Sequence, residues 1–513
     1  MAELVETTSS SFLGLSMSCC RCHDHKYDPL SQADHFRLRA FFEPVKFADD
    51  VPLDTAGDQE AIRRHNEQVE QRIKPWQEQR DALLAAVKDR LRTERIAKLP
   101  GEEQELLKLT RDQCTPEQKE KIEALEKKVA VRDKEVAAAL TAQEKPRHDE
   151  LTKQIDKVKK EKRDFTLGLL MTDTTEKVPL TKILYQGDHK QERDPVAPGF
   201  ISALDPNPAA LRKASNLKTT GRRLTLAEWI ASEDNPLTAR VLVNRVWQNH
   251  FGRGLVATPN DFGLAGERPT HPELLDWLAS EFMREGWSLK KLHRLVVTSS
   301  VYRQVSAPSG GFAKRAGAID GDNKLLWRQN LRRLTAEQLR DSLLAVSGTL
   351  QMKSGGPPVW PELPAEILQA NPAFLDDNAE KTKGWYPSPP NERNVRSVFL
   401  VQKRTVRVPF METFDLPENA VSCARRNQSI VPPQALSLLN GPLSIQAARD
   451  LAARIQRCEN AEPSVQVEAA FSLALQREPT SDERRACLAL LQQRNLTELC
   501  RALLNLNEFI YVD

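Results

Sequence analysis

The stretch Met17–Pro29, with the sequence MSCCRCHDHKYDP, concentrates side chains that bind metals. It holds three of the 8 cysteines and two of the 9 histidines of the chain. Cys19, Cys22 and His23 form the pattern C-x-x-C-H, which is typical of covalent haem c attachment. Two intervening residues let both thiols reach one edge of a porphyrin, and the next imidazole can then bind the iron. The sequence therefore predicts a haem c cofactor held by these three side chains.

The same stretch also supports a metal site without a porphyrin. Thiolate and imidazole ligands suit zinc or iron. His23 and His25 are the first candidates for such a site, with Cys19, Cys22 and Met17 as alternative ligands. Within the haem hypothesis, His25 and Met17 are candidates for the second axial ligand on proximity alone. A third interpretation is a chance match among reduced structural cysteines, which the density of Cys and His in this stretch disfavours.

The overall charge of the chain is close to balance. Its 513 residues include 74 Lys and Arg and 71 Asp and Glu, for a formal net charge of +3. Because proteins that coat nucleic acids are usually more basic, we expect no nucleic-acid partner. Basic pairs nevertheless recur, and we interpret them as ion-pairing residues beside the core rather than as a helix-turn-helix surface. These pairs are Arg222-Arg223, Arg332-Arg333, Lys403-Arg404 and Arg425-Arg426.

Several features disfavour common protein classes. No apolar run approaches the ~20 residues of a transmembrane helix, so no transmembrane segment is expected. Met1–Ser11 lacks a basic region followed by an apolar core, so we expect no signal peptide in this chain. The sequence contains no P-loop, G-x-G-x-x-G, G-x-S-x-G or H-E-x-x-H pattern, which removes the usual grounds for assigning an enzyme. The remaining cysteines show no paired spacing, so no dense disulfide framework is expected for Cys20, Cys114, Cys423, Cys458, Cys487 and Cys500.

Composition predicts a mainly α fold in four parts, of which the first two are residues 1–50 and 51–165. The first part carries one helix, opened by a capping box at Ser31–Asp34, and is too short to enclose a haem or to form its own core. We therefore expect it to be the end of a larger domain. The second part is a charged helical hairpin arm, interpreted as a spacer, with a coiled-coil partner surface as the alternative. Its apolar stripe consists of Ile122, Leu125, Val129, Val136 and Leu140.

Residues 166–220 are predicted to contain short strands and a Pro-rich linker, and residues 221–513 a large C-terminal helical domain with few short strands. One of these strands is expected at Ser397–Val401. Seven of the 8 tryptophans lie between Trp229 and Trp385, so we expect the main core there. Four capping boxes predict helix starts, at Thr225, Thr270, Thr335 and Thr480.

Three further histidines are weaker candidates for ligands. His250 closes a predicted helix before Gly252, where a cationic imidazole would favour the helix C-terminus. His271 lies at a predicted helix start, and His293 is expected on a solvated helix face. We therefore interpret all three as structural residues.

The stretches Phe12–Leu15 and Cys19–Leu30 resemble the end of the planctomycete cytochrome-C-like domain. The chain from Arg223 onward is similar to the domain of unknown function that usually follows it. The matching segments are Asn235–Arg240, Val243–Trp247, Asp261–Gly263, Leu325–Arg328, Pro432–Leu436 and Asn507–Phe509. By this resemblance, residues 1–50 are the C-terminal part of a cytochrome-like domain.

The resemblance implies an exported protein, because relatives are large and often carry a signal peptide and a further cytochrome-like module. We therefore expect an extracytoplasmic or periplasmic haem c protein that transfers electrons to an unknown redox or surface protein. The first alternative is a zinc or iron site in a structural or hydrolytic protein. The second is a cell-surface interaction scaffold without catalysis. An enzyme activity is not favoured by any of the motifs.

Overall fold

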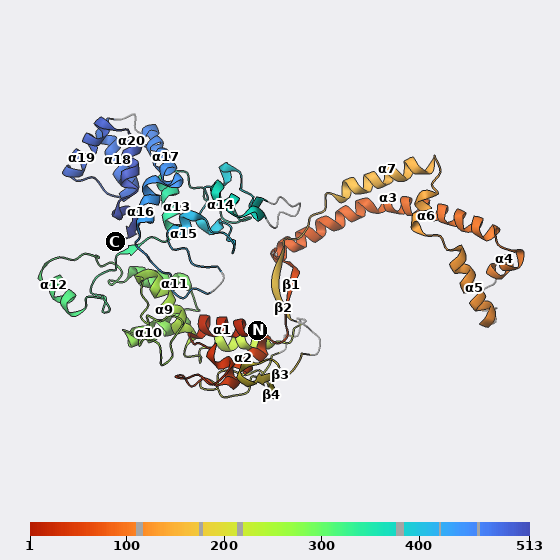
Figure 1. Cartoon of the computed structure of the whole chain (residues 1–513), viewed down its shortest axis with the longest axis horizontal. Coiled ribbons are helices and arrows are strands. Elements are labelled where there is room, and N and C mark those ends of the chain that lie inside the picture. The colour runs from red at the N-terminus through yellow and green to blue at the C-terminus, as the bar shows by residue number, and fades with distance from the viewer. Residues whose placement is uncertain are drawn as a thin grey trace. The chain divides into compact units, whose positions relative to one another are not determined.

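The computed structural model of the chain is mainly helical, with small sheets between the helices (Figure 1). It describes residues 1–108, 116–173, 178–212, 219–375, 384–419, 422–458 and 462–512. Within these ranges the strands form three two-stranded antiparallel sheets. The prediction of a mainly α fold is confirmed. The chain divides into two compact units, Met1–Pro44 with Thr175–Asp513, and Val45–Thr174.

The first unit contains both termini of the chain. Its strands are β3 (Thr181–Leu184), β4 (Glu192–Val196), β5 (Arg332–Arg333) and β6 (Tyr511–Val512). Its helices up to residue 346 are α1 (Ala2–Thr8), α2 (Gln32–Phe42), α8 (Arg222–Ile230), α9 (Thr238–Phe251), α10 (Pro272–Arg284), α11 (Leu289–Thr298), α12 (Gly310–Ile319) and α13 (Ala336–Val346). The remaining helices are α14 (Ala365–Ala370), α15 (Pro409–Thr413), α16 (Pro432–Asn440), α17 (Pro442–Cys458), α18 (Pro463–Leu475), α19 (Ser481–Gln493), α20 (Leu496–Leu503) and α21 (Asn507–Ile510).

Helix α2 begins at the predicted capping box. The Ser31 hydroxyl accepts a hydrogen bond from the backbone N–H of Asp34, and the Asp34 carboxylate accepts one from the backbone N–H of Ser31 in return. The same carboxylate is fully buried and also accepts from the backbone N–H and the hydroxyl of Ser202. A buried carboxylate is costly unless its oxygens are satisfied. These bonds therefore fix the start of α2 against the segment that follows β4.

Two of the four predicted capping boxes are present. Thr335 and Thr480 each cap their helix, and the backbone N–H of each threonine donates in return to the side chain of the third helical residue. Thr225 instead lies inside α8, where its hydroxyl donates to the carbonyl oxygen of Gly221. Helix α10 follows His271 with no side-chain cap, so only its predicted start is confirmed. The four-residue pattern caps a helix only where the backbone at its first residue is extended, as it is at Thr335 and Thr480.

The larger apolar core lies further along the chain than the tryptophans indicated. The segments α13, α15–α18 and α20–α21 bury a continuous cluster of Leu, Ala, Phe, Ile and Val side chains. A second core joins α9, α10 and α11 through Trp247, Phe251 and Phe282 among others. Trp277 is 53% exposed rather than part of the buried face of α10. The tryptophan count was misleading because small aliphatic side chains pack helices together more closely than indole rings do.

The predicted strand at Ser397–Val401 is wrong. Ser397–Phe399 forms the short 3-10 helix η7. The Ser397 hydroxyl and backbone N–H both donate to the Asp341 carboxylate, and the hydroxyl also accepts from Arg340. These side-chain bonds hold the start of the segment against α13. Its end forms only an isolated parallel bridge, between Leu400 and Val359, rather than a strand.

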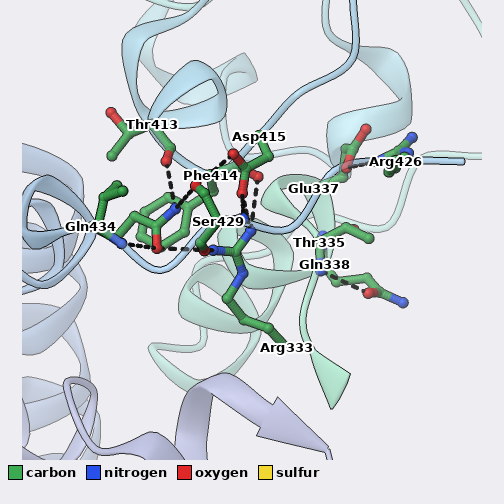
Figure 2. Close-up of polar contacts among 11 residues, drawn as sticks. Arg333, Thr335, Glu337, Gln338, Thr413, Phe414, Asp415, Arg426, Ser429 and Gln434 are labelled. Atoms are coloured by element: carbon green, nitrogen blue, oxygen red, sulfur yellow. Dashed lines mark hydrogen bonds and ion pairs between the residues drawn. The ribbon is translucent and has the colours of Figure 1, made fainter. Parts of the chain in front are cut away.

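A buried guanidinium joins the start of α13 to the segments around α15 and α16 (Figure 2). Arg333 donates to the Asp415 carboxylate, to the side-chain oxygen of Gln434 and to the carbonyl oxygen of Ser429. Ser429 in turn donates to the Asp415 carboxylate from its backbone N–H and its hydroxyl. Burial acts to raise the pKa of Asp415, but the bonds from Ser429 and Arg333 outweigh it and hold this pKa below its usual value.

The second unit is a helical arm that begins and ends at a two-stranded ribbon. Strand β1 (Val45–Pro52) pairs with β2 (Leu167–Asp173). Strand β1 was not predicted, whereas β2 lies within residues 166–220, where short strands were expected. The arm helices are α3 (Ala56–Ala97), α4 (Gly101–Lys108), α5 (Pro116–Val129), α6 (Asp133–Ala138) and α7 (Glu144–Lys159). The sequence Thr115–Gln118 also has the pattern of a helix start, and its capping residue Thr115 lies outside the described residues. In the described ranges no helix is long and apolar enough to cross a membrane, since even α3 is interrupted throughout by charged residues.

The apolar stripe of the arm is divided between two helices and buried within the arm. Helix α3 packs against α7 through Val69, Ile73, Ile155 and Val158. Further along α3, Val87 packs against Val136 of α6 and the partly buried Leu140. The stripe residues Ile122, Leu125 and Val129 of α5 are also buried. This internal burial favours the interpretation of the arm as a spacer.

We predict that Asp415→Asn destabilises the protein by about 3 kcal/mol, because it leaves the Arg333 guanidinium buried without its countercharge. Denaturant unfolding of the whole chain measures this change. As the folded-state pKa is depressed, the contribution is present above the unfolded pKa of about 3.9 and is lost as the pH falls through the folded value.

Asp276→Asn is the matched control, because it breaks the exposed pair with Arg240 and is expected to cost less than about 1 kcal/mol. Equal effects of the two substitutions would show that the Arg333 network does not stabilise the fold.

Candidate functional site

The C-x-x-C-H stretch opens with a short helix that aligns its two outer thiols. Cys19–Arg21 forms the 3-10 helix η2, which ends at Cys22. A 3-10 helix has about three residues per turn, so residues i and i+3 lie on the same face. Cys19 and Cys22 are both exposed, and neither forms a disulfide. The structure therefore presents two free thiols on one face of η2.

His23 follows directly and is also exposed. Its Nδ1 lies 2.7 Å from the carbonyl oxygen of Asp24. A carbonyl only accepts, so Nδ1 must carry the proton, and the neutral ring then has its lone pair on Nε2. Histidines that bind metals usually make this kind of second bond, which fixes their tautomer and ring orientation. His23 is thus held in the tautomer that leaves the Nε2 lone pair free.

The backbone of the stretch is held by the first residue of α2. Gln32 donates from its side-chain amide to the carbonyl oxygens of Arg21 and Cys22, at 3.1 and 2.9 Å. The same amide nitrogen lies 2.9 Å from the carbonyl oxygen of Leu184 at the end of β3. The backbone N–H of Gln32 donates to the Asp24 carboxylate at 2.7 Å. One side chain therefore ties the thiol-bearing turn to both α2 and the β3–β4 hairpin.

The turn between β3 and β4 lies directly against one of the thiols. Gly187 has a positive φ of 75°, and a Cβ at this position would lie 2.8 Å from the Cys22 sulfur. Any larger residue would meet both the backbone strain and the sulfur. The Cys22 sulfur can therefore occupy its position only because Gly187 has no side chain.

The third thiol of the stretch is part of the core. Cys20 is fully buried, and its sulfur lies 3.6 Å from the carbonyl oxygen of Leu30. Burial raises the pKa of Cys20 to about 12, so its thiol stays protonated and unreactive at neutral pH. Met17 is also fully buried, which keeps its thioether away from any ligand unless the core repacks. Cys20 and Met17 thus anchor the stretch while Cys19 and Cys22 face solvent.

His25 is built into the loop that follows. Its Nδ1 lies 3.0 Å from the backbone nitrogen and 3.3 Å from the carboxylate of Asp28. Asp28 is itself buried and accepts a hydrogen bond of 2.6 Å from the backbone N–H of Leu264. A Cβ on Gly263 would lie within 2.5 Å of both Asp28 carboxylate oxygens, so the two backbones approach closely there. The loop is thereby locked onto the segment after α9.

The candidate metal ligands do not converge on one point. Within the residues that the structure describes, no three or more His, Cys, Asp or Glu side chains are grouped so that they could hold a metal ion. His23 and His25 are held by different local bonds, as described above. The thiols and His23 therefore lie in sequence order on one exposed turn rather than around a closed tetrahedral site.

Sequence reasoning missed two features of the histidines. His250 Nε2 lies 2.8 Å from His293 Nδ1, although the two residues are on α9 and α11. Burial and the neighbouring His293 and Arg332 lower the pKa of His250, which argues against the expected cationic helix cap. His35 was also overlooked. It is buried on α2, its Nδ1 bonds the carbonyl oxygen of Met17 at 3.1 Å, and burial lowers its pKa to about 4.

Comparisons with known families match two parts of the chain. The family described as "PSD1: Protein of unknown function (DUF1553)" matches residues 222–491, which is just over half of the chain. The family described as "PSCyt2: Protein of unknown function (DUF1549)" matches residues 1–47, which include the C-x-x-C-H stretch. Neither the curated proteins nor the solved structures offer a match to this chain.

The burial pattern predicts which thiols react. In the native chain Cys19 and Cys22 should react rapidly with a thiol reagent such as DTNB, whereas Cys20 and Cys500 should react only on unfolding. Cys19→Ser with Cys22→Ser should remove two rapid equivalents, and Cys20→Ser should remove none. Rapid reaction of Cys20 in the folded protein would contradict the structure.

His35 predicts a pH dependence of stability. Its folded-state pKa of about 4 lies below the unfolded value of about 6.5. The stability it contributes is therefore fully present above pH ~6.5 and is lost as the pH falls to ~4, a difference of roughly 3 kcal/mol. His35→Gln should flatten the pH dependence of the unfolding free energy in this window. His189→Gln, which changes a side chain that is 83% exposed, should leave it unchanged, and a wild-type slope in His35→Gln would refute the assignment.

Proposed function

The chain belongs to the PSD1 family of proteins of unknown function (DUF1553), and we propose that its Cys19–His23 turn attaches haem c and transfers electrons outside the cytoplasm. The observation that carries the proposal is the pairing of two exposed, unbonded thiols with an exposed imidazole whose Nδ1 is already bonded to a carbonyl. The match of residues 1–47 to the PSCyt2 family supports it, since that name refers to a cytochrome.

The donor set fits covalent attachment. Cys19 and Cys22 would hold the haem through two thioether bonds, each formed by addition of one thiol S–H across one vinyl group, with no net oxidation or reduction. Cys19 and Cys22 can do this without first breaking a disulfide. Cys20 cannot compete, because its thiol is fully buried and out of reach of a porphyrin. The fold thus selects two of three neighbouring thiols.

His23 would bind the iron from one side. Its Nδ1 bond to Asp24 presents Nε2 as the free acceptor and leaves no choice of tautomer. Gln32 holds the consecutive carbonyls of Arg21 and Cys22, between the first thiol and the imidazole. When bound, the haem would supply a one-electron redox couple whose potential depends on its axial ligands and exposure. Exposure of the turn suits electron exchange with a protein partner.

A second candidate function rests on His25. The Asp28 carboxylate lies 3.3 Å from its Nδ1, but this nitrogen accepts a hydrogen bond from the backbone N–H of Asp28. A metal ion at Nε2 would therefore require the ring proton to move to Nδ1, from where it would donate to the carboxylate. A zinc or iron ion held by His23 and His25, with Cys19 or Cys22, would then serve structure or hydrolysis. This alternative requires the two imidazoles to reorient toward each other, which the haem proposal does not. The third candidate is a surface scaffold with neither group.

We predict that the chain, expressed with export and haem-attachment machinery, carries about one haem that survives denaturation. Cys20→Ala should stay fully loaded and serves as the matched control, because it changes a neighbouring thiol that faces the core. Cys19→Ala or Cys22→Ala should each remove one thioether, and the double variant should lose covalent haem. Haem staining of denatured protein and the reduced absorption spectrum measure these outcomes.

The same preparations separate the alternatives. An exported cytochrome of known loading, expressed in parallel, shows that the machinery works. If that cytochrome is loaded and the wild-type chain is not, the haem proposal is refuted. Zinc or iron that disappears in both His23→Ala and His25→Ala would then favour the metal site, and neither signal would favour the scaffold.

A further inference from the structure

Two of the basic pairs noted in the sequence meet at one cavity. The cavity has a volume of about 690 Å³ and is lined by residues of α9, the start of α13 and the segment 422–428. We call it the arginine cavity, because five arginines line it: Arg245, Arg253, Arg332, Arg425 and Arg426. The residues that line it include no Asp or Glu and no aromatic side chain. This gives the cavity a cationic and hydrophilic wall.

Two of the five arginines are neutralised from outside the cavity. Arg253 pairs with Glu267 at 2.8 Å, and Arg426 pairs with Glu337 at 2.6 Å. Figure 2 shows the second pair beside the capping bond between Thr335 and Gln338, close to the Arg333 network. Glu337 and Arg333 therefore hold the α13 side of the cavity in place. Neither of them pairs with the other three arginines of the cavity.

The other three arginines have no carboxylate partner within the described residues. Arg245 donates to the carbonyl oxygens of Ser10 and Ser11 and to the side-chain oxygen of Asn260. Arg332 donates to the carbonyl oxygen of Asn249. Arg425 is exposed and forms no ion pair in the part of the chain that the structure describes. Each of these groups keeps a full positive charge that neutral acceptors do not cancel.

Holding three uncompensated cations around one cavity is unfavourable. Burial lowers the pKa of both Arg245 and Arg332, which reflects the cost of removing these charges from water. The side-chain Nε atoms of Arg245 and Arg253 are buried and have no hydrogen-bond partner among the described residues. An anionic ligand would offset this repulsion, since arginine forks bind carboxylate, sulfate and phosphate groups in a bidentate manner.

We propose that the arginine cavity binds a small hydroxylated molecule that carries two or three anionic oxygen groups. The charge of the ligand follows from the three unpaired guanidinium groups. Its hydroxyl groups would meet the polar side chains that line the cavity, such as Asn249, Gln338 and Gln428. The volume lies in the range of small-molecule sites. A wall without aromatic rings disfavours bases that bind by stacking, so a nucleic acid is not the ligand expected here.

The anionic groups of the ligand can be carboxylates, or they can be phosphate or sulfate esters. Titration calorimetry of the full chain with citrate and with pyrophosphate distinguishes these two sources, and acetate serves as the singly charged comparison. At least one of the two multivalent probes should bind about tenfold or more tightly than acetate. Binding of citrate alone would identify carboxylates, and binding of pyrophosphate alone would identify ester anions. Equal, weak binding of all three probes would overturn the proposal.

Substitutions test whether the unpaired arginines are responsible. Arg425→Gln and Arg332→Met should each weaken binding of the multivalent probe by about tenfold, the loss expected for one charge-assisted contact. Arg449→Gln removes an equal charge from the exposed face of α17, outside the cavity, and should leave binding unchanged. An equal loss in Arg449→Gln would mean general charge attraction and would refute the site.

A cysteine in the cavity gives an independent measurement. Cys423 is exposed and lines the cavity wall next to Arg425. In a Cys19→Ser, Cys22→Ser background, mass spectrometry can follow its alkylation by neutral iodoacetamide and anionic iodoacetate. The bound probe should slow both reactions, and Arg425→Gln should slow iodoacetate more than iodoacetamide. If the probe does not protect Cys423 at saturation, it binds elsewhere and the proposal fails, even when the variant chains are correctly folded.

Discussion

The buried carboxylate of Asp34 is the constraint on which the geometry of the candidate site depends. It is fully buried, yet it accepts hydrogen bonds from Ser31, Ser202 and Arg37. Leaving such a group unsatisfied would cost several kcal/mol, so the chain can enter α2 in only one way. Gln32 lies in the same helical turn and, from there, holds the carbonyls of the C-x-x-C-H stretch. The position of the thiols thus follows from the start of α2.

A second set of contacts joins the two family regions of the chain. Leu264 donates to Asp28, and the backbone N–H of Phe262 donates to the carbonyl oxygen of Gly14 at 2.7 Å. Arg245 of α9 reaches back to the carbonyls of Ser10 and Ser11. The residues matched to PSCyt2 are therefore packed into the region matched to PSD1 rather than joined to it as a separate module. This packing explains how so short a segment can hold a defined turn without a core of its own.

The chain uses similar residues in opposite ways at two places. Among three neighbouring cysteines, Cys20 is buried and inert while Cys19 and Cys22 remain exposed. Among the paired arginines, Arg333 and Arg426 form ion pairs while Arg332 and Arg425 do not. In both cases the buried or paired residue stabilises the local structure, and its neighbour keeps an exposed thiol or an unpaired guanidinium group. The ion pairs expected from the sequence are thus confirmed for Arg333 and Arg426. Arg332 and Arg425 join Arg245 as the unpaired arginines of the anion site that we propose.

The sequence by itself determined the features that depend on neighbouring residues. These were the mainly α fold, the capping boxes of α2, α13 and α19, and the residues of the C-x-x-C-H turn. Such features are set by the local backbone and by side chains three or four residues apart. The pairing of β1 with β2 was not predicted, because the two strands are separated by the whole arm.

Only the tertiary structure decided which of several equivalent residues is buried. It placed the main core among small aliphatic side chains, buried Met17 and Cys20, brought His250 to His293, and gathered arginines from α9, β5 and the segment 422–428 around one cavity. Burial and charge pairing depend on which distant segments pack together. The free energy that selects among them is a sum over the whole core, which no single stretch of sequence contains.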